Sequence, residues 1–155
     1  MELDKLYNSS TSQKKAIYFS KLALLELCGW IEESVDDIII RHANRNLKVE
    51  SNREYCSKKI VKPTYGFQYT RNIRPMLISL IGLVEVENLE RKLERTGSIS
   101  QLAGCLANIK VSRNIAAHTH LKGVTMRFNA PSRTIGDFNQ ISALLEQIDN
   151  ELRNS

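Results

Sequence analysis

The chain contains only three cysteines, and no two of them form a Cys-x-x-Cys pair. Because Cys28, Cys56 and Cys105 are odd in number and widely spaced, they argue against a disulfide framework or a zinc site, and they favour reduced thiols. Residues 1–12 are polar and unlike a signal peptide, and the apolar runs are too short or too often interrupted by charge to cross a bilayer. Repeats, proline-rich linkers and low-complexity tracts are also missing. We therefore expect a cytoplasmic protein without a membrane segment.

The composition is that of an ordinary globular protein. The hydrophobic fraction is 42%, which argues against wholesale disorder. A length of 155 residues suits one compact domain and is short for two, so we expect residues 1–155 to form a single domain. The net charge of +5 favours an acidic partner such as nucleic acid.

Apolar residues recur at three- and four-residue steps, which is the spacing of one buried helical face. This pattern predicts helices over residues 13–43, 74–96, 98–120 and 134–152 and a shorter one over 51–62, while the residues around Leu3 and Leu6 either form a short helix or fray. Ser-x-x-Gln or Ser-x-x-Glu capping boxes at Ser10, Ser51 and Ser98 are expected to open three of them. The buried faces are expected to be Leu24, Leu27, Ile31, Val35 and Ile38 in the first, and Phe138, Ile141, Leu144, Leu145, Ile148 and Leu152 in the last. The fold class is therefore all-α, a compact bundle of about five helices.

The residues 110–120 hold the densest group of chemically active side chains. The apolar stripe of Ile99, Leu102, Leu106 and Ile109 continues into Arg113, so the pattern predicts a guanidinium on a buried face. Asn114 and His118 are four residues apart and share one face of a continuous helix. Because burying an arginine, an amide and an imidazole without partners is unfavourable, we interpret the cluster as a phosphate-handling site.

Arg113-Asn114-x-x-Ala117-His118 resembles the signature of the HEPN superfamily, an arginine and a histidine separated by four to six residues. The segments 28–34, 66–69 and 130–132 are similar to the HEPN proteins associated with RiboL and PSP domains. The resemblance implies a helical bundle and a metal-independent endoribonuclease of a toxin–antitoxin or phage-defence system. It also implies a homodimer whose motifs meet across the two-fold axis, tRNA or mRNA as substrate, and an antitoxin or larger defence complex as a further partner. In the branch that is silenced by nucleotidyl transfer, a tyrosine stands two residues after the histidine, where this chain has His120.

The chemistry of RNA cleavage fits these residue types. Without a metal or another cofactor, the reaction needs a base for the 2′-hydroxyl, an acid for the leaving 5′-oxygen and positive charge on the phosphate. We assign catalysis to His118 as base or acid, Arg113 as the phosphate ligand and Asn114 as an orienting amide. Because one imidazole cannot serve both sides of one phosphate, a symmetric dimer would supply the second, with His120 as another candidate.

Alternatives remain for each of these assignments. Arg113 would otherwise be a packing arginine paired with a carboxylate of the first long helix, His118 a helix-ending histidine bonded to a carbonyl, and Asn114 a plain interhelical amide. For the whole protein, the alternatives are a non-catalytic HEPN module that binds RNA or a partner protein, and an unrelated helical adaptor.

Two further groups are candidates for supporting roles. Glu33 and Asp37 either face Arg113 and orient it, or lie on a solvated helix face. A basic stretch interleaved with Tyr65, Phe67 and Tyr69 is a candidate RNA surface; in the alternative, the aromatics are core and the cations solvated. The candidate RNA-binding residues are Lys110, Lys58, Lys59, Lys62, Arg71 and Arg74.

Overall fold

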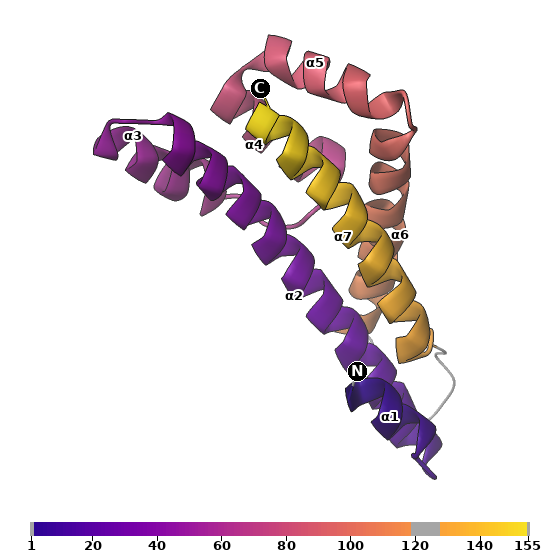
Figure 1. Ribbon diagram of the computed structural model, residues 1–155. Helices are drawn as coiled ribbons and strands as arrows, with labels where there is room; N and C mark the ends of the chain where they lie inside the picture. Colours follow the sequence, from indigo (N-terminus) through magenta and orange to yellow (C-terminus); the bar gives the residue numbers. More distant parts are fainter. Residues whose placement is uncertain (1, 119–127, 155) are drawn as a thin grey trace.

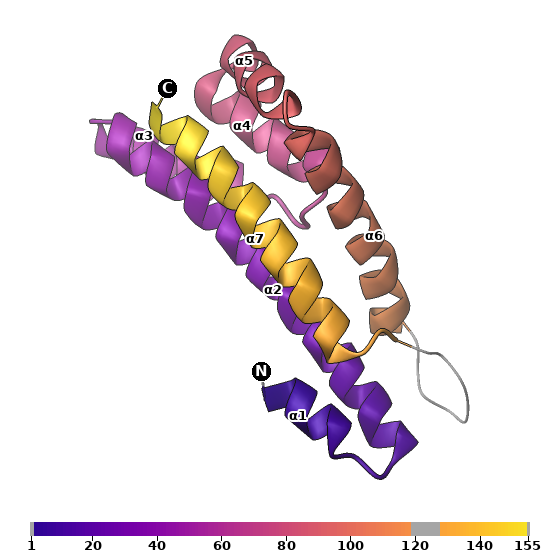
Figure 2. The same ribbon diagram turned by 45° about the vertical axis from the view of Figure 1, so that its right-hand side comes forward.

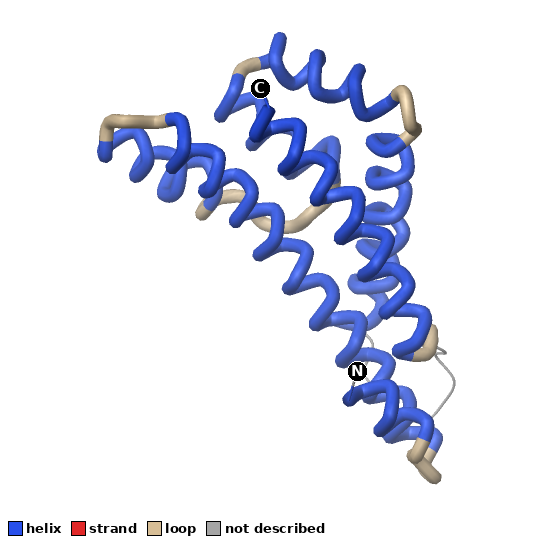
Figure 3. The backbone as a smooth tube through the Cα atoms, viewed as in Figure 1, coloured by secondary structure: helices blue, strands red, loops and turns tan. Residues whose placement is uncertain are grey.

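The computed structural model describes residues 2–118 and 128–154, and all secondary structure in these ranges is helical (Figure 3). The prediction of an all-α bundle is confirmed, although the described residues form more helices than the five expected. None of the described helices is both long and apolar enough to cross a membrane. The α-helices are α1 (Glu2–Asn8), α2 (Gln13–Asn46), α3 (Glu50–Tyr55), α4 (Arg74–Ile81), α5 (Leu83–Glu94), α6 (Ser98–His118) and α7 (Pro131–Asn154). Two π-helices, η1 (Cys56–Val61) and η2 (Tyr69–Ile73), lie between α3 and α4.

Three long helices form the body of the molecule. α2 and α7 run side by side in the same direction, and α6 returns along them in the opposite direction (Figure 1). α1 folds back against the start of α2, and α4 and α5 cover the other end of the bundle (Figure 2). The end of α6 therefore lies near the start of α7, beside the first half of α2.

The predicted buried faces of α2 and α7 are confirmed with one exception. Every predicted position of α2 is buried, and Ile31 is 0% exposed. In α7, the positions from Ile141 to Leu152 are buried, but Phe138 is 36% exposed. Its ring lies against Trp30 of α2, with the ring centroids 4.5 Å apart, so this residue packs at the edge of the core.

A polar cluster fixes the register of α2 against α7 at their C-terminal ends. The Nδ1 of His42 donates to the carbonyl oxygen of Leu152 at 3.1 Å. The Nε2 of His42 accepts from the side-chain amide of Asn46 at 3.2 Å. Burial lowers the pKa of His42, which agrees with the neutral tautomer that these two bonds require. One turn earlier in α7, the buried carboxylate of Asp149 accepts from Arg153 at 2.5 Å.

The prediction of a single helix over 74–96 is wrong, because Gly82 interrupts it and divides it into α4 and α5. Gly82 has φ 85° and ψ 159°, a region that essentially only glycine adopts. The break shifts the helical phase: Val84, which would continue the apolar spacing of Leu77 and Ile81, is 72% exposed, whereas Val86 is 0% exposed. α4 and α5 thus face the core from two directions instead of one.

The three predicted capping boxes are also not formed. α2 begins after Ser12 instead of Ser10, and α3 begins after Val49; neither N-cap makes a side-chain capping bond. Ser98 is the first residue of α6, and its hydroxyl donates to Gln147 of α7 at 2.7 Å. The last helix begins at Pro131, which suits the first helical turn, and not at the predicted residue 134.

Candidate functional site

The C-terminal end of α6 presents Arg113 and Asn114 at the surface. Both side chains are exposed, and an Nη of Arg113 donates to the amide oxygen of Asn114 at 3.4 Å. The prediction that Arg113 is buried is wrong, although Ala116, three residues later on the same stripe, is fully buried. Arg113 does lie on the side of α6 that faces the rest of the molecule, but at this position α6 borders an open hollow instead of packed core. His118 is the last residue of α6, its side chain lies outside the described residues, and His120 lies outside them altogether.

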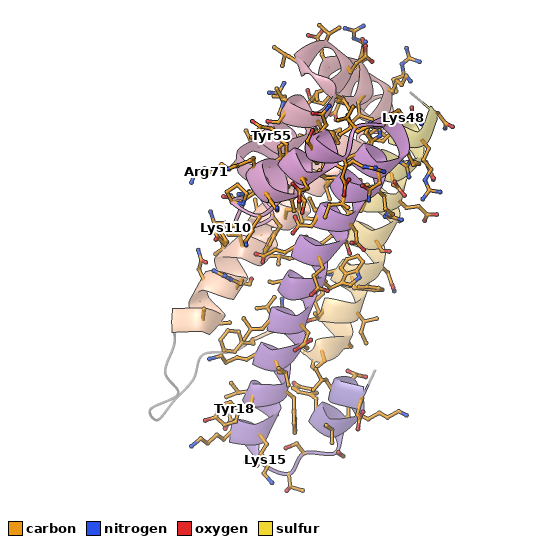
Figure 4. The ribbon with its side chains drawn as sticks, turned by 90° about the vertical axis from the view of Figure 1, so that its left-hand side faces the viewer. Lys15, Tyr18, Lys48, Tyr55, Arg71 and Lys110 are labelled. Atoms are coloured by element: carbon orange, nitrogen blue, oxygen red, sulfur yellow. The ribbon has the colours of Figure 1, made fainter. Side chains whose placement is uncertain are left out.

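The hollow beside Arg113 has a volume of about 390 Å³, and we call it the Arg113 pocket. It lies between α6, α2 and the segment that leads into η2. Its lining residues are Glu32, Tyr65, Gly66, Phe67, Gln68, Arg71, Asn72, Lys110 and Arg113. Lys110 and Arg71 lie near one another at the edge of the molecule (Figure 4). Three cations therefore share the pocket with one carboxylate, which gives it a net charge of +2.

The wall of the pocket opposite α6 is a tight turn held by Asn72. Its Oδ1 accepts from the backbone N–H of Gln68, and its Nδ2 donates to the carbonyl of Tyr65, both at 2.9 Å. Gly66 has φ 98°, a backbone conformation that favours glycine, and a Cβ there would lie in ordinary van der Waals contact with the Asn72 side chain, at 3.4 Å. Lys110 donates to the side-chain oxygen of Gln68 and so links the turn to α6.

Two aromatic side chains anchor this turn, and a third is free at the surface. Phe67 and Tyr69 are buried, whereas Tyr65 is 85% exposed at the pocket. Tyr69 donates to Glu90 at 2.9 Å, and burial, followed by this bond, raises its pKa. Arg74 binds both oxygens of Glu90, at 2.7 and 3.2 Å. The η2 segment that carries Arg71 is therefore fixed to α5 at both of its ends.

The predicted RNA-binding cations divide into three groups. Lys110 and Arg71 line the Arg113 pocket. Arg74 is held by Glu90, and Lys58 pairs with Glu54 one turn away in an exposed ion pair of 2.9 Å. Lys59 and Lys62 are exposed on and just after η1 and do not line the pocket.

The carboxylate at the site is Glu32, not either of the two that were predicted. Glu33 and Asp37 are exposed and do not line the pocket. Glu32 stands four residues after the buried Cys28, so the two residues share one side of α2. Burial raises the pKa of the Cys28 thiol to about 11, Arg113 lowers it and Glu32 raises it further, so both charges lie near this core position.

Arg113 makes no ion pair among the described residues, although Glu32 lines the same pocket. Within the described part of the chain, no three His, Cys, Asp or Glu side chains gather closely enough to hold a metal ion. Comparison of the chain with protein-family models, with curated proteins and with solved structures finds no match.

Proposed function

We propose that the protein is a metal-independent endoribonuclease of the HEPN type, with Arg113 and His118 as its central residues. The observation that carries the proposal is the exposed guanidinium of Arg113, which forms no ion pair with another described residue, in a pocket of net positive charge on the helix that ends at His118. A guanidinium that is free of carboxylates retains its donors for phosphate oxygens. Lys110 and Arg71 would follow the neighbouring phosphates, and the exposed ring of Tyr65 would stack on a base.

In this proposal the reaction is transfer within the RNA backbone. A base removes the proton of a 2′-hydroxyl, the 2′-oxygen attacks the adjacent phosphorus, and the bond to the 5′-oxygen breaks as that oxygen receives a proton from an acid. The products are a 2′,3′-cyclic phosphate and a free 5′-hydroxyl. His118 serves as base or acid, Arg113 stabilises the charge on the phosphate oxygens, and Asn114 orients the imidazole or holds a phosphate oxygen.

The geometry of α6 favours a dimer for this chemistry. One imidazole cannot serve as base and acid on opposite sides of one phosphate, so the proposed reaction needs a second copy of the motif. The outer face of α6 carries the small residues Gly104 and Ala107, both exposed, together with Val111, which is 61% exposed. Small side chains let another helix approach closely, so a second copy would lie along this face and bring both motifs to one RNA strand.

The second candidate is a non-catalytic HEPN module that binds RNA. The cations of the Arg113 pocket favour it, because they would hold phosphates whether or not the RNA is cut. The third, a helical adaptor without affinity for RNA, is disfavoured by the charge of the Arg113 pocket. In either HEPN form, the protein would act on tRNA or mRNA in the reducing cytoplasm, in a toxin–antitoxin or phage-defence system.

The test is cleavage of a tRNA and mRNA pool in the presence of a chelator. We expect the wild type to cut, and Arg113→Ala and His118→Ala each to lose about 10²- to 10⁴-fold in rate. Arg95→Ala, which removes an exposed arginine after α5, is the matched control and should cut normally. Intact RNA bound equally well by the wild type and by the His118 variant would overturn catalysis in favour of the binding module, whereas no RNA binding at all would favour the adaptor.

A further inference from the structure

A second hollow, larger than the Arg113 pocket, lies on the opposite side of α6 from that pocket. It has a volume of about 470 Å³ and is bounded by α2, α6 and the start of α7. Ser112 lines this hollow, whereas the next residue, Arg113, lines the other pocket, so the end of α6 separates the two. We call it the α2–α6–α7 cavity. A volume of this size is typical of sites for small molecules or their parts.

The lining of the cavity combines apolar walls with unpaired amides. Leu24 and Phe128 supply apolar surface. Asn108 and Gln140 place side-chain amides at the cavity, and neither amide forms a hydrogen bond with another described residue. Asp137 adds a carboxylate, whose Oδ1 lies 3.3 Å from the Nε of Arg133 in an ion pair. The side chain of Arg133 is 70% exposed, so its guanidinium can also meet an anion at the rim.

A nucleobase matches this combination better than a purely apolar or purely ionic ligand. Its two faces are apolar and stack on an aromatic ring, and its edges carry the donors and acceptors that Asn, Gln and Asp side chains pair with. A phosphate outside the cavity would meet Arg133. We propose that the α2–α6–α7 cavity binds one nucleobase, carried either by a free nucleotide or by single-stranded RNA.

The RNA source of that base rests on the proposed function, whereas binding of a free nucleotide does not. Ser112 precedes the end of α6 by six residues, or about 9 Å along the helix axis. A base in the cavity and a phosphate at the end of α6 would therefore belong to neighbouring nucleotides. The cavity would then select the base beside the bond that is cut.

Cys105 provides a direct readout, because its half-buried thiol lines the cavity while Cys28 and Cys56 are only 4% and 2% exposed. Burial, and then Asp137, raises the pKa of Cys105, so alkylation is measured at mildly alkaline pH. The probes are the four ribonucleoside monophosphates and the four matching RNA homotetranucleotides, and Cys105→Ser identifies the labelled position. The protein carries Arg113→Ala, which removes the proposed cleavage site and leaves the cavity intact.

We expect at least one base to slow the alkylation of Cys105 about tenfold when its ligand is present at ten times its dissociation constant. Asn108→Leu and Gln140→Met keep the size of the side chains but remove their hydrogen-bonding groups, and either change should weaken that protection. Protection by monophosphates and RNA, or by one of them alone, identifies the source of the base. Unchanged alkylation with all eight probes, or equal protection in both variants, would overturn the proposal without bearing on whether the wild type cuts RNA.

Discussion

Asp36 is held in a way that makes the folded protein less stable at neutral pH. It lies half-buried on α2, one turn after Glu32 and next to Asp37. Burial, followed by the charges of Glu32 and Asp37, raises the pKa of Asp36 from its ordinary 3.8 to about 6. Between these two values the folded chain binds more protons than the unfolded chain, so the contribution of Asp36 to stability falls as the pH rises through this window.

Replacing this carboxylate with an amide should therefore stabilise the protein above that window. Each pH unit between the two pKa values corresponds to about 1.4 kcal/mol, which sets an upper limit of about 3 kcal/mol for Asp36→Asn. Because part of the side chain contacts water, we expect a gain of about 1–2 kcal/mol. The gain should be complete above pH about 6 and should disappear below pH about 4.

The assay is urea unfolding, followed by circular dichroism, of the wild type and the variant across this pH range. The difference between the two proteins isolates Asp36 from all other titrating groups. Asp37→Asn removes the same charge from an exposed neighbour and should give a smaller gain. A gain of equal size in acid and at neutral pH, or no gain at neutral pH, would refute the argument.

Three further predictions concern the break between α4 and α5 and the Arg113 pocket. Gly82→Ala should destabilise the protein by about 1–3 kcal/mol because of the backbone conformation, whereas Gly104→Ala in α6 should stabilise it by up to about 1 kcal/mol. Thermal unfolding measures both changes in stability, and two changes of the same sign would contradict this account. Asn72→Ala should cost about 1–2 kcal/mol through its two lost hydrogen bonds, while Asn52→Ala on exposed α3 should be neutral in the same urea titration. Lys110→Gln should weaken RNA binding and reduce the slope of log affinity against log salt by about 1, and an unchanged slope would remove this lysine from the RNA surface.

The long helices could be predicted from the sequence because their apolar residues repeat without interruption. Leu24 to Ile38 and Ile141 to Leu152 each keep one helical phase, and the structure buries both stripes. The break at Gly82 escaped prediction because a glycine within an apolar repeat is compatible with a continuous helix as well as with a turn. The π-helices η1 and η2 have no comparable sequence signal, since tertiary packing determines where a helix adopts this form.

The candidate site was predicted in part. Arg113 and Asn114 do lie at the end of a helix, but periodicity alone could not show that the apolar stripe opens into a hollow there. Which acidic side chain of α2 shares that hollow depends on how α2 and α6 are rotated against each other. Glu32 and Glu33 are adjacent in the sequence and differ by one step around α2, so a small difference in this rotation determines which of them faces the hollow. No pattern within a single helix specifies the rotation.

The central proposal is that a 2′-hydroxyl attacks the phosphate without a metal. The most direct measurement compares an RNA that is cut at a known position with the same strand carrying a single 2′-deoxynucleotide on the 5′ side of that bond, both in a chelator. The account predicts a 2′,3′-cyclic phosphate end on the all-ribose strand and no cut at that position in the substituted strand. A cut at the deoxynucleotide, or a 3′-hydroxyl end on the all-ribose strand, would contradict it.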